Sequence, residues 1–417
     1  MEYPTIKHID RTGRPVIYRV LNIPHLWLYF LIAVMLALHF WVITKPEAIV
    51  WDETWYVNDA RSIINGQGDI RPEHPAIGKL FIVLGIRMFG DSAFGWRFFS
   101  IIFGTIAIVL FYLICLKLKL SRKTTFFATF LFALDDMFFV HSSLALLDIY
   151  LLTFTLAALL LYLHKQYIPS GLMIGLSALC KLNGITTLGI IVLHWLAMRR
   201  DRPWEMLGTI VITFLSFFAF IVPIEYSLLG KFVDPIQRIK DMWVLTTINK
   251  FTNPPLSISS RPWEWLYPWN IIVYNWDNPQ YYSFISWTIQ LLIVPTFGYM
   301  IYRAMKGNNI AWFALSWFAV TYFFWYIATL TTNRVTYVFY FLITTPAVCL
   351  GISLGIDDLL NYCKTRTEHI GRTTRGVKAI YGGIISYFVL HLAIFIMFNP
   401  AVPFLFRCFL PFDTGSS

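Results

Sequence analysis

Two carboxylates stand side by side directly after the first long apolar segment, at Asp52 and Glu53. Trp51, Trp55 and Tyr56 flank them, which suits a partly dry pocket. A carboxylate in such a pocket can take a proton from a hydroxyl group that attacks an electrophile. Adjacent side chains in an extended or loop backbone point apart, so we expect one of the pair to act as a base and the other to orient the site.

A second polar group follows twenty residues later, at Glu73 and His74, with a proline on each side that fixes a non-helical backbone. Lys79 comes at the start of a helix-like run over 80–89 and could lie close to a bound anion. His74 is equally explained as a structural hydrogen-bonding residue in a turn. The spacing of these carboxylates and this histidine matches no standard set of metal ligands, so we expect no metal ion.

Further ionisable residues sit next to other apolar segments. Arg97 could hold a phosphate with its guanidinium group, or could simply reach the membrane interface. Asp148 could belong to a functional site, or it could cap the N-terminus of the helix that starts beside it. The remaining polar positions of this kind are Asp135, Asp136, His141, Lys181, Asn183 and Arg334.

The composition places all of these groups in a membrane protein. The chain has 417 residues, 57% of them hydrophobic and 13% charged, and its mean hydropathy is +0.62. Soluble domains carry about 25% charged residues, so an ordinary soluble domain is excluded. The net charge of +10 needs no nucleic-acid partner, because cytoplasmic loops of membrane proteins collect Lys and Arg. Five cysteines without a CxxC motif support neither a disulfide framework nor a zinc site.

A bilayer-spanning helix needs about 20 apolar residues, and on this basis the chain is predicted to be an all-α polytopic protein with about eleven transmembrane helices. The predicted spans are 25–43, 97–117, 125–140, 147–163, 170–182, 185–198, 206–229, 284–302, 310–330, 335–356 and 379–398. The fifth is short, so the count around 165–200 is open. The long first loop is expected to carry short amphipathic helices.

Basic residues in the short loops predict the orientation. They put residues 1–24 in the cytoplasm, without a cleavable signal peptide, and 399–417 outside as a tail. The membrane domain is then 25–398, with outer loops at 44–96 and 230–283. The second of these, rich in Trp, Tyr and Pro, is expected to lie along the membrane surface. The candidate site residues all fall on the outer face, whereas unrelated structural polar residues would scatter to both faces.

Carboxylates and cations beside a lipid-facing cavity suit transfer of a group from a lipid-linked phosphate. A carboxylate would take the acceptor's proton, and Arg and Lys would hold the phosphate leaving group. The less favoured interpretation is a transporter, which usually places its charges near the bilayer midplane and shows inverted repeats. Neither feature is visible in this sequence.

The sequence resembles the protein O-mannosyltransferases of the GT-C superfamily in several motifs that occur in the family's order. His74–Lys79 (HPAIGK) resembles the family's HPPLGK-type motif, and Asn333–Pro346 resembles its Arg-to-Pro segment. The other matching segments are Asp52-Glu53, Trp96-Arg97 leading to Gly104, Leu134-Asp135-Asp136, Leu146-Leu147-Asp148 and Pro262-Trp263-Glu264-Trp265.

The resemblance implies eleven helices and a metal-independent, inverting transfer of mannose, or a similar hexose, from a polyprenyl or dolichyl phosphate. The implied acceptor is a Ser or Thr hydroxyl of an exported protein, and no cofactor is needed. Asp52 would be the base and Glu53 its neighbour in the site. Donor phosphate binding would fall to Arg97, Lys79 and Arg334. Other site residues would be Glu73, His74, His141 and Asp148.

The chain also departs from the family's pattern. Ser143 stands where the family usually has Arg, so a cation is absent there or is supplied by His141. Ala76 replaces a proline, and the loop 230–283 has no room for the large outer domain of eukaryotic members. These departures suggest a compact member in the plasma membrane of a prokaryote. A lipid or cell-wall glycan, as in the aminoarabinose transferases, is the alternative acceptor.

Overall fold

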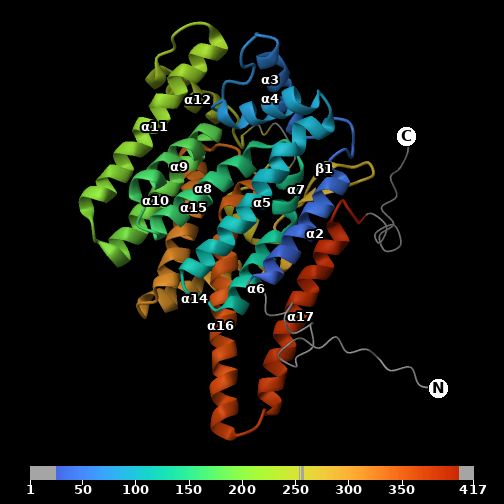
Figure 1. Cartoon of the computed structure of the whole chain (residues 1–417), viewed down its shortest axis with the longest axis vertical. Coiled ribbons are helices and arrows are strands. Elements are labelled where there is room, and N and C mark those ends of the chain that lie inside the picture. Colours follow the sequence, from blue (N-terminus) through green and yellow to red (C-terminus); the bar gives the residue numbers. More distant parts are fainter. Residues whose placement is uncertain (1–24, 253, 255–257, 403–417) are drawn as a thin grey trace, which may run out of the picture.

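The computed structural model describes residues 25–252, 254 and 258–402, and helices dominate this part of the chain (Figure 1). The α-helices are α2 (Leu26–Val42), α3 (Glu53–Ile64), α4 (Ile77–Phe89), α5 (Ala93–Lys117), α6 (Arg122–Ala133), α7 (Asp136–Ser143), α8 (Leu147–Leu163), α9 (Tyr167–Cys180), α10 (Thr186–His194), α11 (Pro203–Leu229), α12 (Pro235–Thr247), α13 (Trp287–Gln290), α14 (Ile293–Met305), α15 (Asn309–Thr332), α16 (Thr345–Ile370) and α17 (Arg375–Phe398). Short 3-10 or π turns are η1 (Leu182–Ile185), η2 (Trp195–Arg199), η3 (Pro262–Leu266) and η4 (Val338–Ile343), and the strands are β1 (Ile272–Asn275) and β2 (Tyr281–Ser283).

The helices confirm an all-α membrane fold. Among the described residues, α5, the continuous run η1–α10–η2, α11, α15 and α17 are each long and apolar enough to cross a bilayer. The bent pair α6–α7 adds a sixth candidate, and α2, α8 and α9 are shorter apolar helices. The count of eleven spans remains a prediction. The predicted cytoplasmic segment 1–24 and most of the predicted tail, 403–417, lie outside the described residues.

Three predicted spans are not single helices. The segment 125–140 is divided into α6 and α7, which meet at 62°. Asp135 makes the break, because its carboxylate accepts the N–H groups of Phe138 and Ser286 at 3.3 and 2.8 Å and so starts a new helix. The segment 335–356 begins as η4 and continues past its predicted end, as α16, to Ile370. The segment 284–302 is divided between α13 and α14.

The first long loop carries α3 and α4, as expected. The helices α4 and α5 pack closely where two glycines face each other. A Cβ added at Gly85 would lie 2.1 Å from the carbonyl oxygen of Gly95, and one added at Gly95 would lie 2.2 Å from that of Gly90. This close approach fixes the loop helices against the membrane helix that follows them.

The described part of the second long loop, predicted to lie along the membrane surface, forms regular structure. It contains α12, η3 and a two-stranded antiparallel sheet in which Ile272 faces Ser283 and Val273 faces Tyr282. The sheet lies on the folded body: the backbone N–H of Met137, in α7, donates to the carbonyl of Phe284, the residue after β2. At the opposite end of the molecule, α16 and α17 form a hairpin that projects beyond the other helices (Figure 1).

Candidate active site

Asp52 lies at the start of α3, partly buried, at the N-cap position. In the described part of the chain, no group donates a hydrogen bond to its carboxylate. Burial raises the pKa of this carboxyl to about 6; the charges of Lys181 and Arg71 lower it and that of Asp148 raises it. Among the described residues, the Asp52 carboxylate therefore has no hydrogen-bond donor, and it has both positively and negatively charged side chains near it.

Glu53 turns the other way, into the protein, where it is fully buried with Arg97. Nε and Nη2 of Arg97 donate to the two carboxylate oxygens of Glu53 at 2.8 and 2.7 Å. The remaining guanidinium N–H groups donate to the carbonyls of Ile43, Pro46 and Ala48. Glu53 also accepts the backbone N–H of Ala145 at 2.9 Å. This buried pair ties the chain before Asp52 to α5 and to the turn before α8.

The side chain of Lys79 is also fully engaged by neighbouring groups. Its buried ammonium group lies 2.7 Å from a carboxylate oxygen of Asp59 and donates to Asp69 at 2.7 Å and to the carbonyl of Arg71 at 2.5 Å. A lysine has three N–H groups, so none remains for a ligand. The structure thus gives both Lys79 and Arg97 the role of holding loops. Phosphate binding by Lys79 and Arg97 remains a prediction, and these contacts leave little room for it.

Lys181 is the cation that lowers the pKa of Asp52 most. It follows the last residue of α9, in extended backbone, and its ammonium group donates to both carboxylate oxygens of Asp148 at 2.9 and 3.1 Å. The aromatic rings of Tyr340 and Phe339 lie 5.1 and 5.6 Å away. Asp148 does not cap α8, as one interpretation expected, because it lies in the first turn and pairs with Lys181. A small cavity lined by Asp148, Asn183, Tyr340 and their neighbours adjoins this pair.

The rim of the site is the loop before α4. Arg71 stacks on Trp55 at 3.5 Å and lies 3.6 Å from the carboxylate of Glu73. Burial lowers the pKa of His74 well below its usual value, and the positive charges of Lys181, Lys79 and Arg334 lower it further. His74 is therefore a neutral ring at physiological pH, next to Tyr56.

The segment between α15 and η4 adds another cation. Arg334 is partly exposed, and its guanidinium group lies over the rings of Trp325 and Tyr340 at 5.3 and 5.9 Å. Its one side-chain hydrogen bond among the described residues is a long one, 3.5 Å, to the Tyr340 hydroxyl. Most of its N–H groups are thus available to a ligand.

His141 of α7 is linked to the residue before Asp52 through Tyr274. Its Nε2 is 3.0 Å from the hydroxyl of Tyr274, and the Tyr274 ring stacks on Trp51 at 5.1 Å. Ser143 does not join this group, because its hydroxyl pairs with His39 of α2 at 2.9 Å. Asp136, like Asp135, bonds to Ser286 and belongs to the connection between α7 and the sheet. Among Asp135, Asp136, His141 and Asp148, the last two thus belong to the surroundings of Asp52.

Sequence reasoning missed Arg71 and underrated Lys181. The sequence did contain a signal for Lys181. A charged residue at a break between two apolar helices costs free energy to bury, so it usually has a functional role. Arg71 carried no such signal, because nothing in the sequence places it on Trp55. Together these described residues form a site with the carboxylate of Asp52, which has no hydrogen-bond donor among them, a lysine and two arginines, and such a set can accept a proton and hold an anion.

Comparisons with known proteins bear on the family and the fold of this chain. Residues 89–234 match the model of the family described as dolichyl-phosphate-mannose-protein mannosyltransferase, which confirms the resemblance over that segment. The segment contains Asp148 and Lys181 but not Asp52.

Curated relatives carry the name polyprenol-phosphate-mannose–protein mannosyltransferase. The one from Mycolicibacterium smegmatis is 31% identical over 121 residues, which are 28% of this chain and 23% of the relative. The one from Corynebacterium glutamicum is 35% identical over 127 residues, 28% of this chain and 24% of the relative. The matched part thus spans about a quarter of the relatives' length.

Two solved structures share the fold. The Saccharomyces cerevisiae protein O-mannosyltransferase Pmt1-Pmt2 complex bound to the sugar donor has a TM-score of 0.69 at 12% identity and covers 95% of this chain and 92% of that one. ArnT from Cupriavidus metallidurans bound to undecaprenyl phosphate has a TM-score of 0.62 at 15% identity, covering 91% and 77%. The predicted GT-C fold is thereby confirmed.

Proposed function

We propose that this protein is an integral-membrane glycosyltransferase that moves mannose from a polyprenyl phosphate to a Ser or Thr hydroxyl of an exported protein. The family match and the named relatives support the donor and the acceptor class. The observation that carries the proposal is the free carboxylate of Asp52 beside the buried Lys181–Asp148 pair.

Asp52 is the base in this proposal. The acceptor hydroxyl oxygen attacks the anomeric carbon of the sugar, and its proton passes to the Asp52 carboxylate. The bond between the anomeric carbon and the phosphate oxygen breaks on the opposite side, which inverts the configuration. The lipid phosphate leaves as an anion and needs no proton, so one base suffices. The reaction as proposed needs no metal ion or other cofactor.

Lys181, Arg334 and Arg71 hold the phosphate. Lys181 keeps one N–H group beyond the two that Asp148 accepts, and Arg334 keeps most of its own. Charge–charge attraction in a partly dry site stabilises the negative charge that grows on the leaving phosphate. Asp148 has the task of keeping Lys181 charged and oriented.

Glu53, Arg97 and Lys79 are positioning residues. The Glu53–Arg97 pair fixes the turn that presents Asp52, and Lys79 fixes the loop that presents Arg71, Glu73 and His74. We propose that Glu73 and the neutral His74 line the entrance for the acceptor. The charge bias of the loops supports placing this site on the outer face of a prokaryotic plasma membrane.

A transfer assay tests the proposal. Purified protein is incubated with radiolabelled polyprenyl-phosphate mannose and a Ser/Thr-rich peptide, with an identical Ala-substituted peptide as control. Label in the first peptide alone supports protein O-mannosylation. Label in an added glycolipid or cell-wall glycan instead supports the alternative acceptor. If the protein binds the donor but labels none of the acceptors, the proposed transferase activity is contradicted.

A further inference from the structure

A row of aromatic side chains begins at the residue before Asp52. The ring of Trp51 stacks on that of Tyr274, with the centroids 5.1 Å apart and the planes at 6°. The Tyr274 hydroxyl lies 3.0 Å from Nε2 of His141. Burial raises the pKa of Tyr274 well above its usual value, and the negative charge of Asp52 raises it further. The Tyr274 hydroxyl thus lies within electrostatic range of the proposed base.

Phe339 of η4 extends the row to Lys181. Its ring lies 5.6 Å from that of His141 and 6.5 Å from that of Tyr274. The ammonium group of Lys181 lies 5.6 Å from the centroid of the same ring. We call Trp51, Tyr274, His141 and Phe339 the aromatic row. It connects the neighbour of the proposed base to the proposed phosphate-binding lysine.

Two polar atoms of the aromatic row lack a partner. In the part of the chain that the structure describes, Nε1 of Trp51 and Nδ1 of His141 are buried and make no hydrogen bond. The side chain of His141 is almost fully buried, so bulk water does not satisfy it. A buried polar atom left unpaired costs free energy, and its presence beside a site is explained if a ligand supplies the partner.

The backbone at Trp51 adopts a conformation that is unusual for a bulky residue, with φ at +50° in the left-handed region. The surrounding turn fixes it. The backbone N–H of Val50 donates to the Glu53 carboxylate at 3.2 Å, and that of Thr54 donates to the Trp51 carbonyl at 3.0 Å. Residues held in such conformations cluster at active sites and at positions that clamp ligands.

The proposed transfer reaction determines where the sugar lies. Its anomeric carbon receives the acceptor oxygen on the side of the base and releases the phosphate on the opposite side. The hexose therefore lies between Asp52 and the cations that hold the phosphate, which is the interval that the aromatic row spans. Aromatic rings offer flat apolar surface to the C–H groups of a pyranose, and a few polar atoms fix its orientation.

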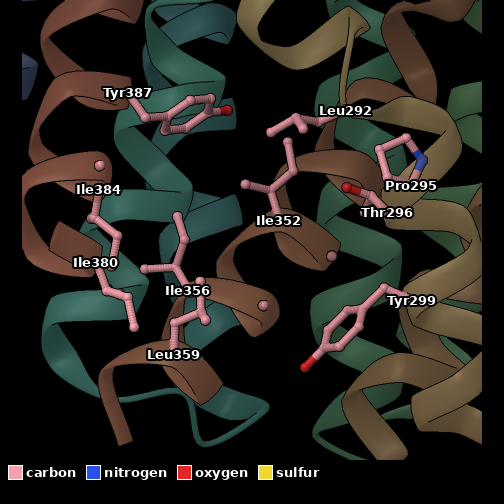
Figure 2. A pocket seen from close by; sticks show the side chains of 13 residues that line it. Leu292, Pro295, Thr296, Tyr299, Ile352, Ile356, Leu359, Ile380, Ile384 and Tyr387 are labelled. Carbon is pink, nitrogen blue, oxygen red and sulfur yellow. The ribbon is translucent and has the colours of Figure 1, made fainter. Parts of the chain in front are cut away.

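The apolar cavity between α14, α16 and α17 does not offer such partners (Figure 2). Its volume is about 550 Å³, and Figure 2 shows walls made mostly of isoleucine and leucine side chains. The hydroxyl groups of Tyr387 and Tyr299 are already bonded, to the carbonyl of Thr288 and to Asp358. Burying sugar hydroxyls there without partners would cost free energy, so the aromatic row is the better match.

We propose that the aromatic row holds the hexose of the lipid-linked donor, with Nε1 of Trp51 and Nδ1 of His141 bonded to sugar hydroxyls. This assignment rests on the proposed transfer reaction and makes both side chains determinants of sugar recognition. The indole N–H of Trp51 donates to a hydroxyl oxygen. A site built to bond a substrate hydroxyl discriminates strongly against a ligand that lacks it, because the polar groups of the site are then left unpaired.

Binding of two lipids tests the assignment. Polyprenyl phosphate with and without mannose, on identical chains, is titrated onto purified protein, and the ratio of the two Kd values measures recognition of the sugar. Trp51→Phe keeps an aromatic ring and removes the N–H group. We expect it to weaken binding of polyprenyl-phosphate mannose about tenfold and to leave binding of polyprenyl phosphate unchanged. His141→Gln keeps a polar group for the Tyr274 hydroxyl but has none at the position of Nδ1, and it should show the same selective loss.

Trp287→Phe is the matched control. Trp287 of α13 also has a buried Nε1 without a hydrogen bond to any described residue, but its ring packs on Phe284 and Phe398 rather than on the aromatic row. This variant should bind both lipids as wild type does. Equal weakening of both lipids by Trp51→Phe would indicate a structural role and overturn the assignment. If wild type transfers mannose and both row variants keep its selectivity, the assignment alone fails. If wild type does not bind polyprenyl-phosphate mannose, the proposed function fails with it.

Discussion

Lys181 and Asp148 form a buried ion pair in which the ammonium group lies 2.9 and 3.1 Å from the two carboxylate oxygens. The pair joins two elements, because Lys181 directly follows the end of α9 and Asp148 lies in the first turn of α8. The pair places one positive charge beside the free carboxylate of Asp52.

Lys181→Met should abolish transfer and also destabilise the protein. Removing one partner of a buried pair leaves the other charge unpaired, which costs about 3–5 kcal/mol. The double variant Lys181→Met/Asp148→Leu removes both charges and should recover most of the thermal stability without recovering transfer. Recovery of transfer in the double variant would remove Lys181 from the proposed phosphate site.

Arg97→Lys should destabilise the fold. A lysine has three N–H groups and cannot replace the five hydrogen bonds that Arg97 makes to Glu53 and to three carbonyls. We expect a loss of about 3 kcal/mol in unfolding free energy. Arg61→Lys is the control, since the Arg61–Asp91 pair is solvent-exposed and worth about 0–1 kcal/mol. Similar melting temperatures for both variants would contradict the buried role of Arg97.

The transfer rate should rise with pH through about pH 6. The pKa of Asp52 is raised to about 6, chiefly by burial, and only the deprotonated carboxylate can take a proton. Log kcat/KM measured from pH 4.5 to 8 should therefore rise with unit slope below pH 6 and level off above it. A profile that is flat across this range would contradict the assignment of Asp52 as the base.

The same shift has a consequence for stability, with the opposite sign. The folded protein holds the Asp52 proton more tightly than the unfolded chain, so this group's contribution to stability falls as pH rises from about 4 to about 6. The Asp52→Asn variant has no titrating group there, so its stability does not fall with pH for this reason. Thermal melts at pH 8 should show Asp52→Asn to be at least as stable as wild type, and a clear drop in its melting temperature would mean that the carboxylate supports the fold.

Gly85→Ala should destabilise the contact between α4 and α5. The new methyl group would lie 2.1 Å from the Gly95 carbonyl oxygen, so the helices must separate. Overpacking of this kind costs about 1–3 kcal/mol. Gly298→Ala, in another apolar helix and with no atom within 4 Å of the added carbon, should leave the melting temperature unchanged or raise it.

The sequence allowed the fold class and most helix positions to be predicted, because long apolar runs have few alternatives in a membrane. It could not show the division of 125–140, which depends on the hydrogen bond that the backbone N–H of Ser286, some 150 residues away, donates to the Asp135 carboxylate. The same limit applies to the site. Carboxylates beside apolar segments pointed to Asp52 and Glu53, and the structure separates them into a free carboxylate and a buried one.

The sequence could not show which cationic side chains are available to bind a ligand. Arg97, Lys79 and Arg334 are alike in the sequence, since each lies beside an apolar segment on the predicted outer face. Only the three-dimensional contacts show that acidic side chains and carbonyls consume the hydrogen-bond donors of Arg97 and Lys79, whereas most donors of Arg334 stay available. Partners that are distant in the sequence decide which charge is free to bind a ligand.

The central claim is that Asp52 is the base, and single-turnover transfer by Asp52→Asn tests it most directly. The variant and wild type are loaded with radiolabelled polyprenyl-phosphate mannose and mixed with the same acceptor, after melting curves and donor binding show that both are folded and loaded. We predict donor binding close to wild type and a transfer rate at least about 10²-fold lower. A transfer rate within a few-fold of wild type would contradict the claim.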